Sequence, residues 1–530
     1  MNAARGQSLL VQLSRRGFVD AAKASELLAT APFSEPLGEP VLDALGASAD
    51  PDLALHGLIR ILEASTKPSQ LVEDLIEDAD LCLRLTAVLG VSSGLTDHLV
   101  RHPADYLLLA QQDAPTRPTA AALRSSMLNA VGADPRSETP VATSSEPLND
   151  MRIGYHRHLL QLAARDLVDG AAVDDVAAEL ADLAASALDA ALAVARSDLA
   201  HGAEPVRLAI VGMGKCGGRE LNYVSDVDVI FLAEAMSGGD EEAALNTANR
   251  LAAGVARACM AVTAEGFLWE VDAGLRPEGA SGPLARTLAS HVAYYQRWAK
   301  SWEFQALLKA RPVAGDVQLG TAYADAIHPM VWQAAAREGF VSEIQSMRRR
   351  VEEQIPVADV DRQIKLGPGG LRDVEFAVQL LQLVHGRSDP GLRKGNTLRA
   401  LDALTVGGYV GRDDAASLDR AYRFMRMLEH RIQLFRLRRT HLMPEDLVEL
   451  RRLGRSVGYR KDPVTELTDE WRRQVREVRR LHEKLFYRPL LNAVARLDPG
   501  EVRLTPEAAS ARMEALGYRD PAGALRHIEV

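Results

Sequence analysis

The sequence predicts a mainly α-helical protein with a small mixed α/β core that is flanked by helical bundles. Apolar residues recur at three- and four-residue spacing over long stretches before residue 200 and after residue 288, as they do in amphipathic helices. Between these stretches lie short runs rich in β-branched residues and punctuated by glycine, which is typical of strands joined by tight turns. At 530 residues, the chain is also long enough for several domains.

The composition favours a globular protein. Charged residues make up 25% and hydrophobic residues 47%, and no run of about eighteen apolar residues occurs, so neither disorder nor membrane contact is expected. The first residues lack the pattern of a secretory signal, which favours a cytoplasmic location. A net charge of −10 argues against a nucleic-acid partner. Three cysteines without a Cys-x-x-Cys motif argue against a disulfide framework and a thiolate zinc site.

Residues 1–200 are predicted to form a helical N-terminal region. Helical spacing is clearest at residues 71–89 and 173–199. Residues 113–147 instead collect Pro, Ser, Thr, Asp and Gly with little periodicity. This composition predicts a loop or a mobile linker.

Residues 201–330 are predicted to form the α/β core. Residues 206–212, 226–232 and 267–272 have the short, β-branched character of strands, and residues 241–264 have the spacing of a helix. Helical spacing then returns and predicts a helical bundle over residues 331–500. Its predicted helices, together with one that precedes it, are 294–310, 342–354, 371–385, 398–404, 415–437 and 466–491. Basic clusters at 348–350 and 436–439 are interpreted as solvated helix faces, and residues 501–530 as the start of a linker or a further domain.

The segment GMGKCGG at residues 212–218 follows a predicted strand and matches the glycine pattern of dinucleotide-binding folds. Those folds need a crossover of at least about ten residues before the next parallel strand. Only residues 218–225 are available here. A Walker phosphate loop is also excluded, because Lys215 is followed by Cys216 rather than Ser or Thr. The segment is therefore interpreted as a tight turn before a short connection.

Asp226 and Asp228 open the next predicted strand, where alternate residues face the same side. A lone Asp-x-Asp is often an ordinary strand edge, but two adjacent carboxylates repel unless a divalent cation binds them. Magnesium accepts such oxygen ligands and leaves positions for phosphate oxygens. Asp272 ends the following predicted strand and is placed to supply a third carboxylate, while Gly217 and Gly218 would let backbone amides approach a phosphate. Together these features favour a catalytic metal site.

At this point the sequence resembles the bifunctional glutamine synthetase adenylyltransferase/adenylyl-removing enzymes, of the nucleotidyltransferase superfamily that includes DNA polymerase beta. The segments that carry the resemblance are 212–231, 271–283, 302–311 and 364–376. It implies a polymerase beta-like nucleotidyltransferase core at 201–330, with the bundle at 331–500 completing the active site. Family members consist of two tandem halves. An initial Met1, the helical lead and residues 365–372 resemble the amino-terminal, adenylyl-removing half, so the carboxy-terminal adenylyltransferase half is expected to be missing.

The resemblance implies phosphorolysis, in which phosphate attacks an adenylyl-tyrosine and releases ADP and free tyrosine. Asp226, Asp228 and Asp272 would be catalytic and would hold two Mg²⁺ or Mn²⁺ ions. Candidates for binding the adenylyl phosphate or the incoming phosphate are Gly217, Gly218, Ser225, Arg276, Lys309, Arg311, Lys365 and Arg372. For each lysine and arginine among them, the alternative is an ordinary surface salt bridge. Asp373 and Glu375 are expected either to orient the cations or to place negative charge at a helix N-terminus.

The resemblance also implies the partners, which are adenylylated glutamine synthetase and a PII-type signal protein. Two alternatives stay open. One is ATP-dependent adenylylation of glutamine synthetase by this same site. The other is a non-catalytic regulatory module that binds glutamine synthetase or a PII protein, against which the intact Asp226, Asp228 and Asp272 argue.

Overall fold

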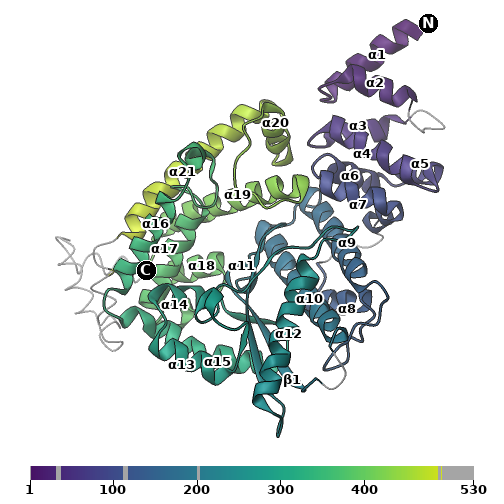
Figure 1. Cartoon of the computed structure of the whole chain (residues 1–530). Coiled ribbons are helices and arrows are strands. Elements are labelled where there is room, and N and C mark those ends of the chain that lie inside the picture. Colours follow the sequence, from purple (N-terminus) through teal and green to yellow (C-terminus); the bar gives the residue numbers. More distant parts are fainter. Residues whose placement is uncertain (1, 31–36, 111–116, 200–202, 488–490, 492–530) are drawn as a thin grey trace, which may run out of the picture.

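The computed structural model describes residues 2–30, 37–110, 117–199, 203–487 and 491, and its helices surround one small sheet (Figure 1). This architecture confirms the predicted fold class. The predicted region 501–530 lies outside the described residues. Among the described residues, no single helix has both the length and the apolar character needed to cross a membrane. Only the pair α6 (Ala79–Leu89) and α7 (Ser93–Arg101), whose axes differ by 118°, passes that test together.

Helices alone precede the first strand in the described part of the chain. They are α1 (Asn2–Arg15), α2 (Ala21–Thr30), α3 (Glu39–Ala47), α4 (Pro51–Ala64), α5 (Pro68–Glu77), α6 (Ala79–Leu89), α7 (Ser93–Arg101), the 3-10 helix η1 (Pro103–Leu109), α8 (Ala120–Ala130), α9 (Pro147–Leu167) and α10 (Val173–Ser197). In Figure 1, α1 to α7 form an arm that leads from the N-terminus to the body of the molecule. The alanine-rich α10 is buried along most of its length, because it packs between α8 and α9 on one side and the core helix α12 (Glu241–Met260) on the other.

The sheet has the strand order β3-β2-β1-β5, and β4 pairs with β2 away from this path. Its strands are β1 (Val206–Gly212), β2 (Val227–Ala235), β3 (Val271–Asp272), β4 (Ala285–Arg286) and β5 (Arg311–Gly315). β1 runs antiparallel to both β2 and β5, whereas β3 and β4 run parallel to β2. The sheet is therefore mixed, as predicted. The antiparallel β1–β2 pair agrees with the rejection of a dinucleotide-binding fold, which requires a parallel crossover at this point.

Both faces of the two central strands are buried, in alternation. Leu208 and Phe231 point into a core shared with the N-terminal helices, while Val211 and Ile230 point into a second core shared with the C-terminal helices. The helices after β3 are α13 (Leu288–Arg297), α14 (Ser301–Leu307), α15 (Val317–Gln333), α16 (Phe340–Glu353), α17 (Leu371–His385), α18 (Thr397–Val406), α19 (Arg412–Arg436), α20 (Leu447–Ser456) and α21 (Pro463–Phe486). Among the described residues, the sheet thus separates two helical layers.

Several predicted elements need correction. The loop predicted at 113–147 contains α8, which buries Leu123 and Met127 in spite of its polar flanks. The helix predicted at 71–89 divides at Asp78, whose side chain accepts the backbone N–H of Leu81 and caps α6. The strand predicted at 267–272 forms only over its last two residues, and the helix predicted at 294–310 is split into α13 and α14. β4 and β5 were not predicted, because β4 has two residues and β5 contains Pro312.

Candidate active site

The turn after β1 lies directly against Asp228, the aspartate within β2. It contains the single helical turn α11 (Gly214–Gly217), and the backbone N–H of Met213 donates to the carbonyl of Asp228 at 2.8 Å. Gly214 has a φ of +50°, and a Cβ at this position would lie 2.5 Å from Oδ2 of Asp228. Only glycine combines this backbone conformation with this close approach. Gly217 and Gly218 were the glycines predicted to lie at the site, but Gly214 is the one that lies against the Asp228 carboxylate.

The structure brings the three predicted aspartates together. Asp228 and Asp272 are register partners across the parallel β2–β3 pair, and Asp226 immediately precedes β2. Each carboxylate offers an oxygen that lies within 4.8 Å of the oxygens offered by the other two. Ser225 Oγ donates to Asp226 Oδ1 at 3.2 Å, and the backbone N–H of Gly274 donates to Asp272 Oδ1 at 2.7 Å. Among the described residues, neither bond uses Asp272 Oδ2 or the Asp228 carboxylate, which leaves these oxygens available to a cation.

The electrostatics of this cluster suit a divalent metal ion. Burial, followed by the charges of the Asp226 and Asp272 carboxylates, raises the pKa of Asp228 to about 6. The apposed negative charges therefore destabilise one another, which a bound cation would reverse. Three converging carboxylates are the hard oxygen ligands that Mg²⁺ or Mn²⁺ accepts. The residues present fit such an ion.

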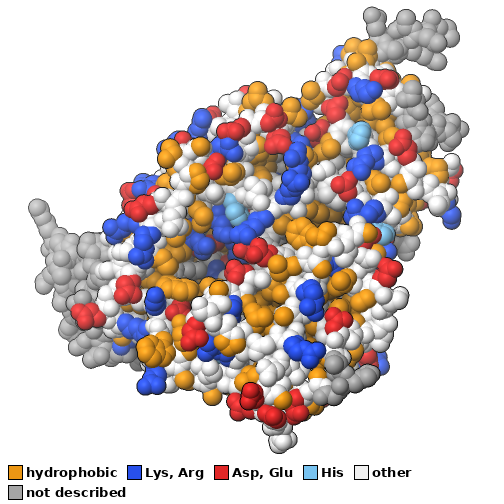
Figure 2. All heavy atoms as spheres, viewed as in Figure 1, with side chains coloured by type: hydrophobic (Ala, Val, Ile, Leu, Met, Phe, Trp, Pro, Cys, Tyr) orange, Lys and Arg blue, Asp and Glu red, His pale blue; other side chains and the backbone are white. Residues whose placement is uncertain are grey.

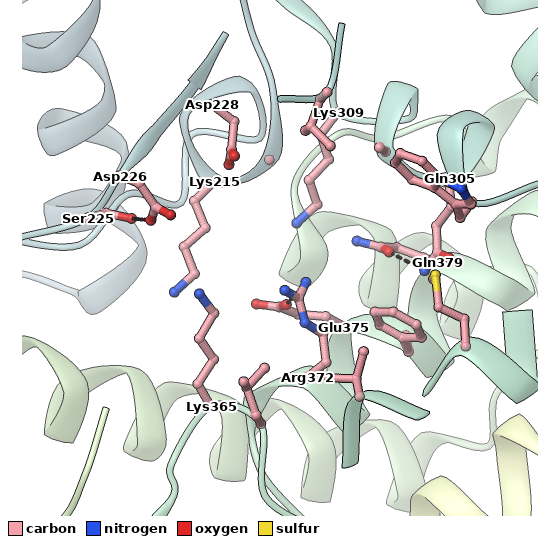
Figure 3. A pocket seen from close by; sticks show the side chains of 18 of the residues that line it. Lys215, Ser225, Asp226, Asp228, Gln305, Lys309, Lys365, Arg372, Glu375 and Gln379 are labelled. Atoms are coloured by element: carbon pink, nitrogen blue, oxygen red, sulfur yellow. Dashed lines mark hydrogen bonds and ion pairs between the residues drawn. The ribbon is translucent and has the colours of Figure 1, made fainter. Parts of the chain in front are cut away.

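Asp226 and Asp228 line a cavity of about 490 Å³, within the size range of small-molecule sites. Asp272, whose carboxylate lies within 4.8 Å of theirs, is not among the lining residues. Figure 2 shows a hollow on this face where basic side chains border acidic ones. In Figure 3, Asp226 and Asp228 approach from the core side, while Lys365, Arg372 and Glu375 approach from the helical bundle. Of the predicted residues, those that line the cavity are Ser225, Asp226, Asp228, Lys309, Lys365, Arg372 and Glu375.

Glu375 lies at the centre of a group of cations. Although burial by itself raises the pKa of Glu375, Arg372 and three lysines lower it to about 2. The lysines are Lys215, Lys309 and Lys365. Arg372 contacts the Glu375 carboxylate at 3.3 Å. One fixed negative charge therefore holds several cations at the cavity, in line with the predicted orienting role. Asp373 takes the other predicted role, since its carboxylate accepts the backbone N–H of Gly369 before α17.

Lys215 is a site residue that was not predicted. Its side chain is mostly buried, and its ammonium lies 3.2 Å from both Asn222 Oδ1 and Glu429 Oε2. Burial lowers the pKa of Lys215 to about 7, even though Glu429 opposes this change. In Figure 3, the ammonium groups of Lys215 and Lys365 point toward one another in the cavity. Two facing cations form a natural position for an anion.

Arg439 is a second residue that was not predicted. Its guanidinium lies 2.9 Å from Asp226 Oδ2 and lines the cavity. It belongs to a basic cluster that was interpreted as a solvated helix face, and that interpretation is wrong for Arg439. The reason is local geometry, because Leu437 adopts a left-handed conformation at the end of α19 and turns the chain toward the site. The prediction is also wrong for Arg348 of the other basic cluster, because this side chain is fully buried against Asp373.

Five predicted residues do not line the cavity. One is Asp272, which joins the other aspartates through the β2–β3 pair. Arg311 donates to the carbonyls of Gly217 and Cys216, and a Cβ on Gly217 would lie 1.9 Å from the Lys309 carbonyl oxygen, so both residues shape the backbone of the turn behind the site. Arg276 donates to carbonyls of its own loop, including that of Ala273 at 2.7 Å. Gly218 and Arg276 therefore lie outside the cavity lining. Lys309 lines the cavity but is also held by an ion pair with Glu220.

Comparison with known proteins identifies relatives. A family model described as Glutamate-ammonia ligase adenylyltransferase matches residues 82–326, and one described as GlnD PII-uridylyltransferase matches residues 344–486. The chain is similar to proteins named bifunctional glutamine synthetase adenylyltransferase/adenylyl-removing enzyme. Identity is 57% with the Streptomyces coelicolor protein, covering 100% of this chain and 52% of the relative, and 56% with that of Streptomyces avermitilis, covering 99% and 52%. For Cutibacterium acnes it is 48%, covering 92% and 49%. The chain spans about half the length of these relatives.

Proposed function

The chain belongs to the family of bifunctional glutamine synthetase adenylyltransferase/adenylyl-removing enzymes, and from that membership we propose that it removes adenylyl groups from glutamine synthetase by phosphorolysis. The observation that carries this proposal is the two-sided cavity. Asp226 and Asp228 on one wall, with Asp272 beside them, face a group of partly buried cations on the other. The first suits metal-assisted nucleotidyl transfer, and the second suits a separate inorganic phosphate.

The acidic wall would bind the metal. Asp226, Asp228 and Asp272 would hold one or two Mg²⁺ or Mn²⁺ ions, which would neutralise charge on the transferred phosphoryl group and help to orient it. Gly214 keeps the space beside Asp228 open, because any side chain there would collide with the carboxylate. Ser225 fixes the Asp226 carboxylate by donating to its Oδ1.

The basic wall would bind the attacking phosphate. Phosphorolysis requires a second anion beside the adenylyl group, whereas hydrolysis would require only water. Lys215, Lys365 and Arg372 supply positive charge there, and Glu375 keeps that charge in place. Confined cations of this kind stabilise phosphate more strongly than exposed ones do.

In the proposed reaction, an oxygen of inorganic phosphate forms a bond to the phosphorus of the adenylyl group. The bond from that phosphorus to the tyrosine oxygen breaks, so the products are ADP and a tyrosine phenolate that takes up a proton. A phenol has a pKa of about 10, so its phenolate leaves more readily than an alkoxide does. The protein's main tasks are therefore positioning and charge stabilisation, which the two walls can provide.

The test is an assay of both directions with the purified chain. Adenylylated glutamine synthetase, phosphate and Mg²⁺ should yield ADP, and Asp226→Asn should reduce the rate by at least about a hundredfold. The matched control is Asp198→Asn, the same change at an exposed surface aspartate, which should leave the rate unchanged. Transfer of AMP from ATP to unmodified glutamine synthetase, without ADP formation in the first assay, would refute the proposal in favour of adenylylation. Unaltered activity in Asp226→Asn would refute the assigned site.

We also propose a PII-type signal protein as a regulatory partner. The support is the match of residues 344–486 to the GlnD PII-uridylyltransferase family model. This region includes α17, whose first turns carry Arg372 and Glu375 to the cavity. A ligand of the bundle would therefore reach the phosphate site directly. Addition of a PII-type protein should change the rate of ADP formation. The part of the relatives that the chain does not span would carry the opposing adenylyltransferase activity.

A further inference from the structure

A second group of metal-ligating side chains lies where the N-terminal helices meet the core. His98 is on α7, His102 directly follows this helix, and Glu265 is in the tight turn at 263–266 between α12 and β3. Each offers a ligand atom that lies within 4.8 Å of those offered by the other two. Two imidazoles and one carboxylate form a common ligand set for zinc and related transition metals.

The hydrogen bonds of His98 are those of a metal ligand. Its side chain is fully buried, and its Nε2 lies 2.9 Å from Asp105 Oδ2. Its other ring nitrogen, Nδ1, is buried and has no hydrogen-bond partner in the part of the chain that the structure describes. A histidine that binds a metal through one nitrogen commonly donates its second N–H to a carboxylate, which fixes the ring and its tautomer. An unpartnered buried nitrogen otherwise destabilises the fold.

The remaining two ligands are already close to the spacing that zinc requires. His102 Nε2 lies 3.0 Å from Glu265 Oε1. Ligand atoms at about 2.0–2.1 Å from a tetrahedral zinc are separated from one another by about 3.3 Å. A small adjustment would therefore replace this hydrogen bond with two bonds to a metal ion.

His156 adds a third imidazole beside the group. It lies on α9, its ring centroid is 5.4 Å from that of His98, and its Nδ1 is also buried without a partner among the described residues. Two arginines balance the acidic residues, since Arg101 contacts Glu265 at 3.1 Å and Arg157 contacts Asp105 at 3.0 Å. Arg101 is partly exposed and can turn toward solvent when Glu265 binds a metal.

We propose that His98, His102 and Glu265 bind a zinc-type divalent ion that fastens the N-terminal helices to the core. Glu265 precedes the catalytic candidate Asp272 by seven residues in the same connection, so the ion would restrain the segment that leads to β3. Another buried contact already joins the same surfaces. Arg152 on α9 donates to the carbonyls of Gly266 and Ala258 at 2.9 Å. The ion would thus add to an existing connection between the N-terminal helices and the core, and this proposal does not rest on the function proposed above.

The test measures Zn²⁺ binding to the metal-stripped full chain that carries Asp226→Asn and Asp228→Asn, so that the aspartate cluster does not contribute. We expect one Zn²⁺ per chain by equilibrium dialysis, a rise in the unfolding temperature with Zn²⁺, and visible absorption of tetrahedral Co²⁺ in its place. His102→Ala and Glu265→Gln should each weaken Zn²⁺ binding by at least about tenfold and remove the thermal shift.

The matched control is His56→Ala, which removes an exposed histidine from α4 and should bind Zn²⁺ as the parent does. Circular dichroism of each metal-free variant checks its fold. If His102→Ala does not fold, Glu265→Gln, which keeps the side-chain shape, still tests whether this site binds Zn²⁺. Absence of Zn²⁺ binding in the parent would overturn the proposal. Equal binding in the parent and Glu265→Gln would also overturn it.

Discussion

Replacing Asp228 by asparagine should stabilise the metal-free protein while it abolishes activity. The pKa of Asp228 is raised from 3.8 to about 6, by burial and then by Asp226 and Asp272. A raised pKa in the folded state contributes stability that is present below the unfolded value and is lost as pH rises through the folded value. At about 1.36 kcal/mol for each pH unit between 3.8 and 6, the ionised group lowers the free energy of unfolding by about 3 kcal/mol near neutral pH.

The assay is urea unfolding in the presence of a chelator, followed by circular dichroism. Asp228→Asn should exceed the free energy of unfolding of the wild type by about 3 kcal/mol at about pH 7.5. At about pH 4 the difference should be only about 0.5 kcal/mol, because Asp228 is protonated in the folded state and only about half ionised in the unfolded state. Mg²⁺ should stabilise the wild type and have little effect on the variant. Asp198→Asn serves as the control, because its carboxylate is exposed. Equal stability of variant and wild type at neutral pH, or a difference that does not shrink in acid, would refute the electrostatic account.

Three further results are expected. Gly214→Ala should reduce activity by at least about tenfold and weaken Mg²⁺ binding, since the new Cβ displaces the Asp228 carboxylate, and isothermal titration with Mg²⁺ checks this. The apparent Mg²⁺ affinity of the wild type should decline as pH falls through about 6, because protonated Asp228 cannot bind the ion, and it should stay level above pH 7. Asp373→Ala should destabilise the protein by about 3–5 kcal/mol in urea, because it leaves Arg348 as a buried unpaired charge. An unchanged free energy of unfolding in Asp373→Ala would contradict the expected contribution of the Arg348–Asp373 pair.

Local sequence patterns predict an element correctly when its own residues decide its structure. β1 and α17 have the predicted boundaries, because a β-branched run and a helical apolar stripe each decide the local structure. The meeting of Asp226, Asp228 and Asp272 also followed from strand periodicity and chain order. The role of each glycine in the turn at 212–218 could not be predicted, because the glycines look alike in sequence. Only the fold shows that Gly214 lies against Asp228.

The basic wall shows what local patterns cannot provide. Lys215 enters the cavity because α19 supplies Glu429 behind it, and these residues are more than two hundred positions apart. Arg439 reaches Asp226 because the chain turns back at Leu437, which no helical periodicity indicates. Similarly, α8 forms because α10 offers it an apolar surface to pack against, in spite of its polar flanks. Long-range packing decided each of these positions.

The double-sided burial of the sheet bears on the substrate proposed above. Among the described residues, apolar layers cover β1 and β2 on both faces, so the aspartates are presented at the margin where β2 begins and not on an open face of the sheet. Under the proposed function, an adenylylated tyrosine would approach along this margin, carried on a segment that protrudes from its protein. Discrimination between protein substrates would then depend on reach as much as on recognition of the nucleotide.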